Sequence, residues 1–578
     1  MFAVLLAAVL PALVPQPGVF EQQACPGGGL PLAAPLRAAA SFDPGGRELL
    51  GRRWRALGIA APVVAANPNL RVTSRVSGDD AAYTLDVDAN GARIAGANAE
   101  GTFDGLATLA QLPVRVNGAW RLPCVHIVDR PALRWRIVSD DISRGPFPTR
   151  AYFEQRIREL AALKINGYSP YLEGVFADPA HPYVAAPSVL WAADLAHLAA
   201  YAARFHVALI PEQQTFAHMH AALQYEALAP LAETPHGYLL ANSDLATYAY
   251  LEPLLRREEA AAGNVPFFHL GVDEPVDLGR GRTARTPQVV ADHIRRVAAV
   301  VARPGTRPVI WDDAIQANPA ILALIPHDIV IATFHYGAEP SFARYIATVA
   351  GAGFDQFVSP GANNWNEIYP DLDVAYANEG QFLADGKAAR VLGMLATVWH
   401  DDGESLYEAT WAPLAFAAAS AWQTTPVDRA QWHRQFARAF FGSDDSGFAR
   451  DLDALAAIRT LLHAKPASDS SDYLFWADPF DAAIGARTPA ADVRAIRLAA
   501  EAVIAQLDDA GAPPLNAAAA RVMRLAAQRY DDLGRRIQIG AEVRALYADA
   551  RSHASTGDDA IVYRDLNQAK YLCWELRD

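Results

Sequence analysis

The stretch "VPFFHLGVDE", residues 265–274, is an apolar run that ends in two adjacent carboxylates, Asp273 and Glu274. Short β-rich runs of this kind recur along the chain, and longer stretches with helical periodicity separate them. The others are "RWRIVSDD" (134–141), "INGYSPYLE" (165–173), "VALIPEQQ" (207–214), "RPVIWDD" (307–313), "DIVIATFHYG" (328–337), "FDQFVSPGANNW" (354–365) and "GMLATVWHDD" (393–402). Eight strands that alternate with helices predict an α/β fold of the (β/α)8 TIM barrel class. A doubly wound open sheet is the alternative, although no glycine-rich phosphate loop follows any of the runs.

Two further units flank the predicted barrel. Upstream, "AYTLDVDANGARIAGANAEGTFDGLATLAQLPV" (82–114) has the pattern of two alternating strands across an Asn-Gly turn, followed by a helix. Beyond residue 426 the chain is alanine-rich with helical spacing, as in "ADVRAIRLAAEAVIAQLDDA" (491–510). We therefore expect a small α/β domain over residues 19–131, the barrel over 132–425 and an α-helical domain over 426–578.

The composition narrows the class of partner. Of the 578 residues, 52% are hydrophobic and 20% are charged, which is ordinary for a soluble globular protein. The formal net charge of −14 argues against a nucleic-acid partner or an anionic membrane surface, because both require a basic face. Neutral and cationic ligands remain open.

The first residues, "MFAVLLAAVLPALVPQP" (1–17), form an apolar segment that is too short to span a bilayer and lacks an initial Lys or Arg. We expect residues 1–18 to be an export signal that directs the protein to the periplasm or the cell exterior; a first strand of the fold is the alternative. The three cysteines, Cys25, Cys124 and Cys573, allow one disulfide and show no spacing typical of a metal site.

The predicted strands end in an unusual number of acids and aromatic residues. In a barrel of this kind the active site is built at the carboxyl ends of the strands, so these side chains are expected to meet. Aromatic faces pack on the apolar face of a pyranose ring, while carboxylates and amides bind its hydroxyls. The strand ends therefore predict a carbohydrate site. They carry Asp140, Asp141, Tyr171, Glu173, Glu212, Asp273, Glu274, Trp311, Asp312, Asp313, His335, Tyr336, Asn363, Asn364, Trp365, Trp399, Asp401 and Asp402.

The adjacent pair Asp273 and Glu274 restricts the mechanism. Neighbouring residues at a strand end point in different directions, so they are poorly placed to flank one glycosidic bond as nucleophile and acid. When the sugar carries a 2-acetamido group, its own carbonyl oxygen can attack the anomeric carbon. The protein then needs one acid to protonate the leaving oxygen and one carboxylate to orient the acetamido nitrogen. Adjacent acids can fill these two roles.

The same stretch resembles a family signature of the form H-x-G-x-D-E, in which His269, Gly271, Asp273 and Glu274 fill every fixed position. In this respect the chain is similar to glycoside hydrolase family 20, the β-N-acetylhexosaminidases. The resemblance covers about residues 60–425 and leaves the C-terminal helices outside it. It continues through "WRIVSDDISR" (135–144), "ALKINGYSPYLE" (162–173), "IPEQQTFAHMHAAL" (210–223) and "LATVWHDDGESLYEATWAPLAFAAASAW" (395–422).

The resemblance implies a retaining exo-β-N-acetylhexosaminidase that hydrolyses terminal β-GlcNAc or β-GalNAc without a metal or an organic cofactor. It implies Glu274 as general acid and base, Asp273 as the acetamido-orienting carboxylate and His218 beside them. We expect Glu274 to have a raised pKa, so that it holds a proton near neutral pH. Substrate contacts are implied for Arg136, Glu173, His269, Trp311, Tyr336, Trp365, Trp399 and Asp401.

The chain departs from the family pattern in three places. Gly174 stands where the second strand of the family has an acid, and Glu173 substitutes for it from one position earlier. Asp401 stands where the family commonly has Glu. In "NNWNEIYPD" (363–371) the candidates for the seventh-strand site are Trp365, Tyr369 and Asp371. These departures bear on substrate preference more than on the reaction.

Other interpretations remain open. An Asp-Glu pair at a strand end is in most proteins a loop start or a helix cap. In the structural alternatives His218 is a core histidine, Arg136 pairs with a core acid, and Trp311 and Trp399 are packing residues. Two function classes compete with the leading one: a related substrate-assisted glycosidase with another 2-acetamido donor, and a non-catalytic carbohydrate-binding barrel. The natural glycan, the oligomeric state and the role of the C-terminal helices are left undetermined.

Overall fold

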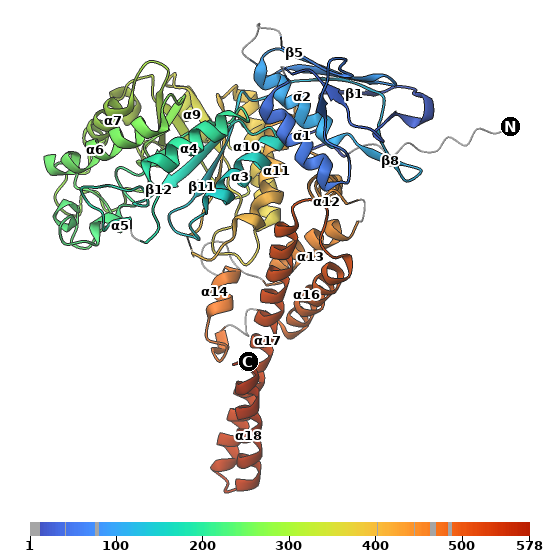
Figure 1. The fold of residues 1–578 in the computed structure, drawn as a ribbon. Helices are drawn as coiled ribbons and strands as arrows, with labels where there is room; N and C mark the ends of the chain where they lie inside the picture. Colours follow the sequence, from blue (N-terminus) through green and yellow to red (C-terminus); the bar gives the residue numbers. More distant parts are fainter. Residues whose placement is uncertain are drawn as a thin grey trace.

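The structure, a computed structural model, describes residues 12–577 except 41, 75–79, 186, 402, 444–445, 463–469 and 484–487. Figure 1 shows three parts: a sheet domain at the N-terminal end, a central barrel with surrounding helices, and a group of C-terminal helices that extends away from both. No helix of the described residues is long and apolar enough to cross a membrane.

The central part is a closed parallel barrel. Its strands pair in the order β11-β19-β18-β17-β16-β15-β14-β12-β13, and β11 also pairs with β12, which closes the ring. The two short strands β13 and β14 both pair with β12 and are successive pieces of one barrel strand. The predicted (β/α)8 barrel is therefore confirmed, and the open sheet is excluded. The strands are β11 (Trp135–Asp141), β12 (Gly167–Leu172), β13 (Ala208–Leu209), β14 (Glu212–Gln213), β15 (Phe267–His269), β16 (Arg307–Trp311), β17 (Val330–Phe334), β18 (Gln356–Ser359) and β19 (Gly393–Val398).

Helices follow the barrel strands and cover them on the outside (Figure 1). Their starts are encoded locally: in α7, Thr286 accepts a hydrogen bond from the backbone of Val289, and Pro287 occupies the first turn. Inside the barrel, residues of alternating strand positions form a separate apolar cluster that includes Ile137, Phe267 and Phe357. The main helices are α3 (Arg150–Ala162), α4 (Ala192–Ala203), α6 (Leu245–Ala262), α7 (Pro287–Val301), α8 (Asp313–Ala317), α9 (Ala343–Ala350), α10 (Leu372–Ala389) and α11 (Trp411–Trp422).

The N-terminal domain is a seven-stranded sheet in the order β1-β10-β6-β7-β5-β3-β4, packed against α1 (Pro44–Ala56) and α2 (Ala99–Gln111). The predicted hairpin and helix are confirmed as β6, β7 and α2. A disulfide joins Cys25 to Cys124 within this domain. The sheet strands are β1 (Val19–Gln22), β10 (Val125–Asp129), β6 (Tyr83–Asp88), β7 (Gly91–Gly96), β5 (Leu70–Ser74), β3 (Arg37–Ala38) and β4 (Val63–Val64); β2 (Leu30–Pro31), β9 (Ala119–Leu122) and β8 (Val114–Val116) form a second, small sheet.

Residues 1–11 of the expected export signal (1–18) lie outside the described residues. From residue 12 the chain packs on the N-terminal domain. Leu13 and Val14 are buried, and Val14 exchanges two backbone hydrogen bonds of 3.0 Å with the side chain of Gln111 on α2. Residues 12–18 form no strand, since β1 begins at Val19.

The C-terminal part is helical, as predicted, and contains no strand among its described residues. Its last two helices form an antiparallel hairpin that projects beyond the rest of the molecule (Figure 1). The helices are α12 (Arg429–Phe441), α13 (Gly447–Leu461), α14 (Ser471–Trp476), α16 (Ala490–Ala510), α17 (Ala517–Ala554) and α18 (Asp559–Glu575).

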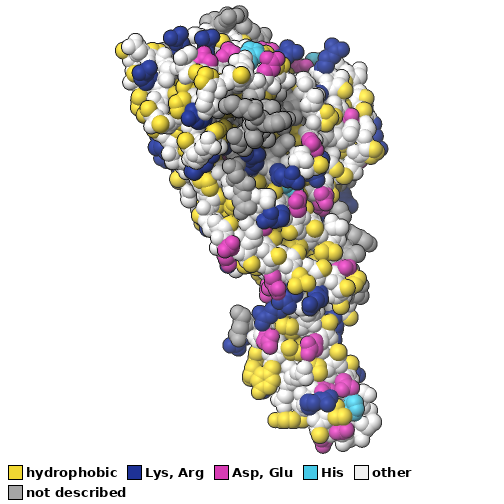
Figure 2. All heavy atoms as spheres, turned by 90° about the vertical axis from the view of Figure 1, so that its right-hand side faces the viewer, with side chains coloured by type: hydrophobic (Ala, Val, Ile, Leu, Met, Phe, Trp, Pro, Cys, Tyr) yellow, Lys and Arg dark blue, Asp and Glu magenta, His cyan; other side chains and the backbone are white. Residues whose placement is uncertain are grey.

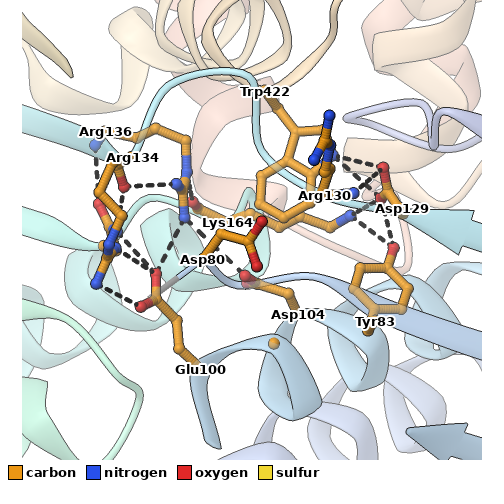
Figure 3. Close-up of polar contacts among 12 residues, drawn as sticks. Asp80, Tyr83, Glu100, Asp104, Asp129, Arg130, Arg134, Arg136, Lys164 and Trp422 are labelled. Carbon is orange, nitrogen blue, oxygen red and sulfur yellow. Dashed lines mark hydrogen bonds and ion pairs between the residues drawn. The ribbon is translucent and has the colours of Figure 1, made fainter. Parts of the chain in front are cut away.

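Arg136 lies at the base of the barrel, where β11 begins, and faces the N-terminal domain (Figure 3). Its guanidinium donates to the backbone oxygens of Lys164 (2.6 Å), Leu133 (3.0 Å) and Arg134 (2.9 Å), and to Glu100 on α2 (3.3 Å). The prediction that Arg136 binds sugar is therefore wrong. Because strand starts and strand ends lie on opposite faces of a barrel, this arginine ties two domains together at the face remote from the strand ends.

A second buried ion pair continues this interface. Lys164 donates to Asp129 and to the hydroxyl of Tyr83 at 2.9 Å each, and the indole of Trp422 donates to both oxygens of Asp129 at 3.0 Å (Figure 3). Asp129 and Tyr83 belong to the N-terminal sheet, whereas Lys164 and Trp422 belong to the barrel. Buried charges of this kind are tolerated because each one is paired and hydrogen-bonded.

We predict that Arg136→Ala lowers the free energy of unfolding by about 3–5 kcal/mol, because it removes the buried cation beside Asp104 and the donor to the backbone oxygens of Lys164 and Leu133. Chemical denaturation of the full chain measures this. Arg134→Ala is the matched control: Arg134 contacts the same Glu100 but its side chain is 36% exposed, so a loss of about 0–1 kcal/mol is expected. Equal losses for the two variants would contradict the assigned role of Arg136.

Candidate active site

A cavity of about 210 Å³ opens at the carboxyl ends of the barrel strands. Every barrel strand, or the loop after it, contributes to its wall, as expected for the functional face of this fold. The wall is made of Arg144, Tyr171, His218, Asp273, Glu274, Trp311, Phe334, Tyr336, Trp365, Trp399 and Asp401.

Most of the residues predicted from the sequence meet in this cavity: Asp273, Glu274, His218, Trp311, Tyr336, Trp365, Trp399 and Asp401. Glu173 lies immediately beside it. Its carboxylate accepts a 2.6 Å hydrogen bond from Tyr171 and lies 3.6 Å from Arg144 and 3.7 Å from His218. Glu173 therefore contacts three residues of the wall, Tyr171, Arg144 and His218, from one position before Gly174.

His269 lies behind the cavity wall and does not line it. The side chain is fully buried, its Nδ1 accepts a hydrogen bond from the backbone of Gly271 (3.1 Å), and its ring centre is 4.5 Å from that of Trp311. Burial lowers the pKa of His269 to about 3, so the ring is neutral. His269 therefore does not reach the cavity, where a substrate contact was predicted for it. Its ring instead contacts Trp311 and the turn that follows β15.

Arg144, not Arg136, is the arginine of this cavity. It pairs with Asp141 (2.8 Å) and with Asp401 (2.7 Å), and its guanidinium lies 5.3 Å from the ring centres of both Tyr171 and Trp399. The sequence contained a usable signal, because Arg144 follows the end of its strand whereas Arg136 stands at the start. The rule that barrel sites form at strand ends favours the former.

Trp365 is the seventh-strand residue that reaches the cavity. Its ring packs 5.1 Å from that of Tyr336. Of the other two candidates, Tyr369 is buried in the main core and Asp371 caps α10 by accepting a hydrogen bond from Val374 (3.1 Å). The same loop is anchored to the C-terminal helices through Glu367, which pairs with Arg459 at 2.7 Å.

The turn after β15 has an unusual backbone. Gly271, Val272 and Glu274 have φ values of +66°, +78° and +50°, in the left-handed region that a β-branched residue such as Val272 rarely adopts. A Cβ on Gly271 would lie 2.0 Å from Gln214 Oε1, so only glycine fits there. This turn brings the side chains of two consecutive residues, Asp273 and Glu274, into one cavity.

Asp273 is held as a carboxylate. It accepts a 2.8 Å hydrogen bond from Gln214 and pairs with His218 Nε2 at 3.2 Å. Burial by itself would raise the pKa of Asp273, but the charge of His218 and the hydrogen bonds from His218 and Gln214 hold that pKa below its usual value. Asp273 is therefore charged across the neutral pH range.

Glu274 has the opposite shift. Its side chain is 57% exposed, at the mouth of the cavity, and its Oε2 lies 3.5 Å from His218 Nε2. Burial and the charge of Asp273 raise the pKa of Glu274, although His218 opposes the shift. His218, whose pKa burial by itself would lower, is raised to about 9 mainly by Asp273, so it supplies a positive charge between the two acids.

Asp313, at the start of α8 after β16, binds the backbone of this turn. Its Oδ2 accepts a 2.7 Å hydrogen bond from the backbone of Glu274, while its Oδ1 is buried without a hydrogen-bond partner among the described residues. Burial, and then the charge of Asp273, raise the pKa of Asp313 to about 7. The turn thus rests on a carboxyl group that is half-protonated near neutral pH. Across the described part of the chain, no three His, Cys, Asp or Glu side chains are grouped in a way that could hold a metal ion.

Residues 10–130 match the family model described as glycosyl hydrolase family 20, domain 2. This part of the chain is therefore similar to glycoside hydrolase family 20, the same family that the H-x-G-x-D-E stretch resembles. The match falls on the domain before the barrel, so it is independent of the H-x-G-x-D-E residues, which lie on the barrel. Two separate parts of the chain thus resemble the same family.

Relatives of the chain carry similar descriptions. Hexosaminidase D of Bos taurus is 28% identical over 202 residues, which are 32% of this chain and 57% of that protein. The chain therefore spans little more than half the length of that relative. Among solved structures, Flavobacterium johnsoniae chitobiase has a TM-score of 0.64 at 16% identity with 96% of each chain covered. A mutant Streptomyces plicatus β-hexosaminidase in complex with its product GlcNAc has a TM-score of 0.60 at 20% identity and covers 75% of this chain and 94% of its own. At these identities the solved structures show the fold.

We predict that Asp313→Asn changes the pH dependence of stability. A carboxyl whose pKa is raised on folding destabilises the folded state above its unfolded pKa and most fully above its folded pKa, here about 7. Asparagine keeps the acceptor for Glu274 and cannot ionise. The variant should gain stability relative to the wild type at pH 8, on the order of 1 kcal/mol or more, and little at pH 4.

Urea unfolding at the two pH values measures this difference. Asp328→Asn, at an exposed carboxylate, is the control and should show the same small difference at both. A gain for Asp313→Asn that does not vary with pH would contradict the raised pKa of Asp313.

Proposed function

We propose that this chain is a retaining exo-β-N-acetylhexosaminidase that removes terminal β-GlcNAc or β-GalNAc by substrate-assisted hydrolysis. The observation that carries the proposal is the pair of consecutive acids in one cavity with opposite pKa shifts: Asp273 lowered and Glu274 raised. Pairs of titratable groups whose environments push their pKa values apart are typical of acid and base partners in catalysis.

In the proposed first step, Glu274 gives its proton to the glycosidic oxygen as the bond from that oxygen to the anomeric carbon breaks. The carbonyl oxygen of the 2-acetamido group bonds to the same carbon, which yields an oxazolinium ion and the free aglycone. Positive charge develops on the acetamido nitrogen, and Asp273, already ionised, accepts the hydrogen bond of its N–H. No side chain of the protein bonds to the sugar.

In the second step a water molecule attacks the anomeric carbon and gives its proton to Glu274, which restores the acid. The carbonyl oxygen leaves, and the configuration is retained because two inversions have occurred. Glu274 suits both directions of proton transfer because its carboxyl lies at the cavity mouth, where aglycone and water arrive.

The shape of the cavity supports removal of one terminal sugar. The wall of the cavity includes the rings of Trp311, Tyr336, Trp365 and Trp399, which offer apolar faces to a pyranose ring and to an acetamido methyl group. We expect Arg144 and Asp401, which pair at 2.7 Å in the cavity wall, to bind sugar hydroxyls. The solved Streptomyces plicatus relative holds GlcNAc, which supports the same class of ligand here.

We further propose that the protein is exported. Disulfides form and persist in oxidising compartments outside the cytoplasm, and Cys25 and Cys124 are joined in this structure. Export predicts that the protein isolated from its natural host is found in the periplasmic or extracellular fraction with a single titratable thiol, Cys573; recovery from the cytoplasm with three thiols would contradict it.

The first test is substrate choice. The nitrophenyl glycosides of β-GlcNAc and β-GalNAc should be cleaved and that of β-glucose should not, because glucose lacks the acetamido nucleophile. A thiazoline analogue of the oxazolinium ion should inhibit. Cleavage of the glucoside would refute the mechanism, and binding of the sugar without turnover would favour a carbohydrate-binding barrel. Cleavage restricted to another 2-acetamido glycoside would favour the related donor class.

Variants at the two acids test the assigned roles. Glu274→Gln should lower turnover by about 100-fold to 10,000-fold. With added azide, no ester between the sugar and a side chain of the enzyme should be found, because the proposed intermediate is an oxazolinium ion. Asp273→Asn should lower turnover by about 100-fold to 1,000-fold, since it removes the charge that faces the developing cation. Near-normal turnover of Asp273→Asn would remove its role.

The pH profile of kcat/KM tests the position of His218. The rising limb should report ionisation of Asp273 and the falling limb deprotonation of Glu274. The positive charge of His218 lowers the pKa of both acids, so His218→Gln should move both limbs to higher pH. Tyr238→Phe, which removes a neighbouring hydroxyl without changing charge, should leave the limbs in place. Limbs of His218→Gln that stay in place, or move in opposite directions, would contradict the arrangement.

A further inference from the structure

The C-terminal hairpin exposes one face that nothing in the described chain covers. Helix α17 has 38 residues and a length of about 57 Å, and its first half packs into the body of the molecule through residues such as Met523 and Tyr530. Its second half carries α18, and the two helices project together from the body (Figure 1). Helix α18 packs along α17 through Asp565 and Ala569 and turns its opposite face outward.

That outward face is rich in large apolar side chains. Tyr563 is 74% exposed and Trp574 is 49% exposed, and Leu566 and Tyr571 are also exposed. Figure 2 shows hydrophobic side chains mixed with acidic and basic ones along the projecting end of the molecule. Tyr563, Asn567, Lys570 and Trp574 recur at intervals of four, three and four residues, the spacing of a seam between two packed helices. An exposed face with two large aromatic residues at this spacing, flanked by Leu566 and Tyr571, is typical of an interaction surface.

The face is complementary to itself when a second copy is turned end to end. Residues of the seam that would meet are arranged about one midpoint, near residue 569: Tyr563 with Trp574 and Asn567 with Lys570. Charged residues are arranged about nearly the same midpoint, so that a basic residue of one copy would lie opposite an acidic residue of the other. Arg564 and Glu575 lie on one flank of the seam, and Asp559 opens the helix that Arg577 follows. In an antiparallel pair of helices, side chains on the same flank meet in reversed order, so each Arg564 would face a Glu575.

We propose that the outward face of α18 binds α18 of a second copy of this chain, in an antiparallel pair related by a two-fold axis near residue 569. Tyr563 and Trp574 fill the ends of the seam, Asn567 and Lys570 lie between them, and two Arg564–Glu575 ion pairs set its register. Such an isologous interface ends at the dimer, because each copy uses the same patch and no second patch remains to bind a third copy.

The shape of the molecule permits this pairing. The hairpin stands clear of the body, and α18 runs from the tip of the hairpin back toward it (Figure 1). An antiparallel pair of α18 helices therefore places the two bodies at opposite ends of the dimer. The active-site cavities belong to the barrels, so the proposal is independent of the catalytic function proposed above.

The test is the mass of the full-length protein in solution over about a hundred-fold range of concentration, measured by sedimentation or light scattering. The wild type should approach twice the mass of the chain as concentration rises. Tyr563→Ser/Trp574→Ser should remain monomeric with unchanged thermal unfolding. Trp476→Ser, at an exposed tryptophan on α14, is the matched control and should dimerise like the wild type.

A charge exchange separates self-association from contacts within one chain. Arg564→Glu should raise the dissociation constant of the dimer about tenfold or more, because two like charges then meet twice. Arg564→Glu/Glu575→Arg should restore the wild-type constant, since the ion pair between copies is rebuilt with its signs exchanged. Within the chain the exchange restores nothing, because Arg564 faces Asp549 and Asp565, and Glu575 faces Arg535.

Three results would overturn the proposal. A wild type that is monomeric at every concentration removes the second copy as the partner. A dimer that persists in Tyr563→Ser/Trp574→Ser places the interface elsewhere. A charge exchange that does not restore what Arg564→Glu removes contradicts the register. Binding of a soluble GlcNAc oligomer to the monomer, lost in Tyr563→Ser/Trp574→Ser, would assign the face to carbohydrate instead.

Discussion

The functional end of this molecule depends on one electrostatic constraint: two acids on consecutive residues share one cavity, Asp273 buried within it and Glu274 at its mouth. Two like charges so close together cannot both ionise freely, so their environments must differ. The protein meets the constraint with one cation. His218 lies 3.2 Å from Asp273 and 3.5 Å from Glu274, and the additional hydrogen bond from Gln214 goes to Asp273 alone. One acid is thereby kept ionised, and the other keeps its proton to higher pH.

The same constraint accounts for the backbone. Consecutive side chains of a strand point to opposite sides, and only a departure from extended geometry brings two of them into one cavity. The left-handed conformations at Gly271, Val272 and Glu274 provide that departure, and such strain persists only where the surroundings hold it. Here the turn is fastened to the next strand, where Trp311 donates to Gly271 (3.0 Å) and Asp313 accepts from Glu274 (2.7 Å). Asp313 thus holds the backbone of this turn, although the burial of its carboxyl group destabilises the fold.

The opposite end of the barrel uses the same kind of group for a different purpose. Arg136 and Lys164 are as deeply buried as any residue of the cavity, and their partners Glu100 and Asp129 come from the N-terminal domain. These pairs hold the domain that precedes the barrel against its base. An arginine at the start of a barrel strand and an arginine beyond its end, only eight positions apart, thus serve stability and the active site respectively.

The sequence by itself determined the layers of this protein. The alternation of β-rich runs with helical stretches predicted the closed barrel, the Asn-Gly hairpin predicted the N-terminal sheet, and the acids and aromatics at the strand ends located the cavity, because hydrophobic period and strand direction are local properties of a chain. Only the tertiary structure decided which charged residues meet. The strand-end rule favoured Arg144 over Arg136, but the pattern could not show that His269 turns away from the cavity, or that Trp365 enters it and Tyr369 does not. Side-chain contacts depend on barrel closure and on the φ angles of a few loop residues, and these are set by packing between segments that lie far apart in sequence.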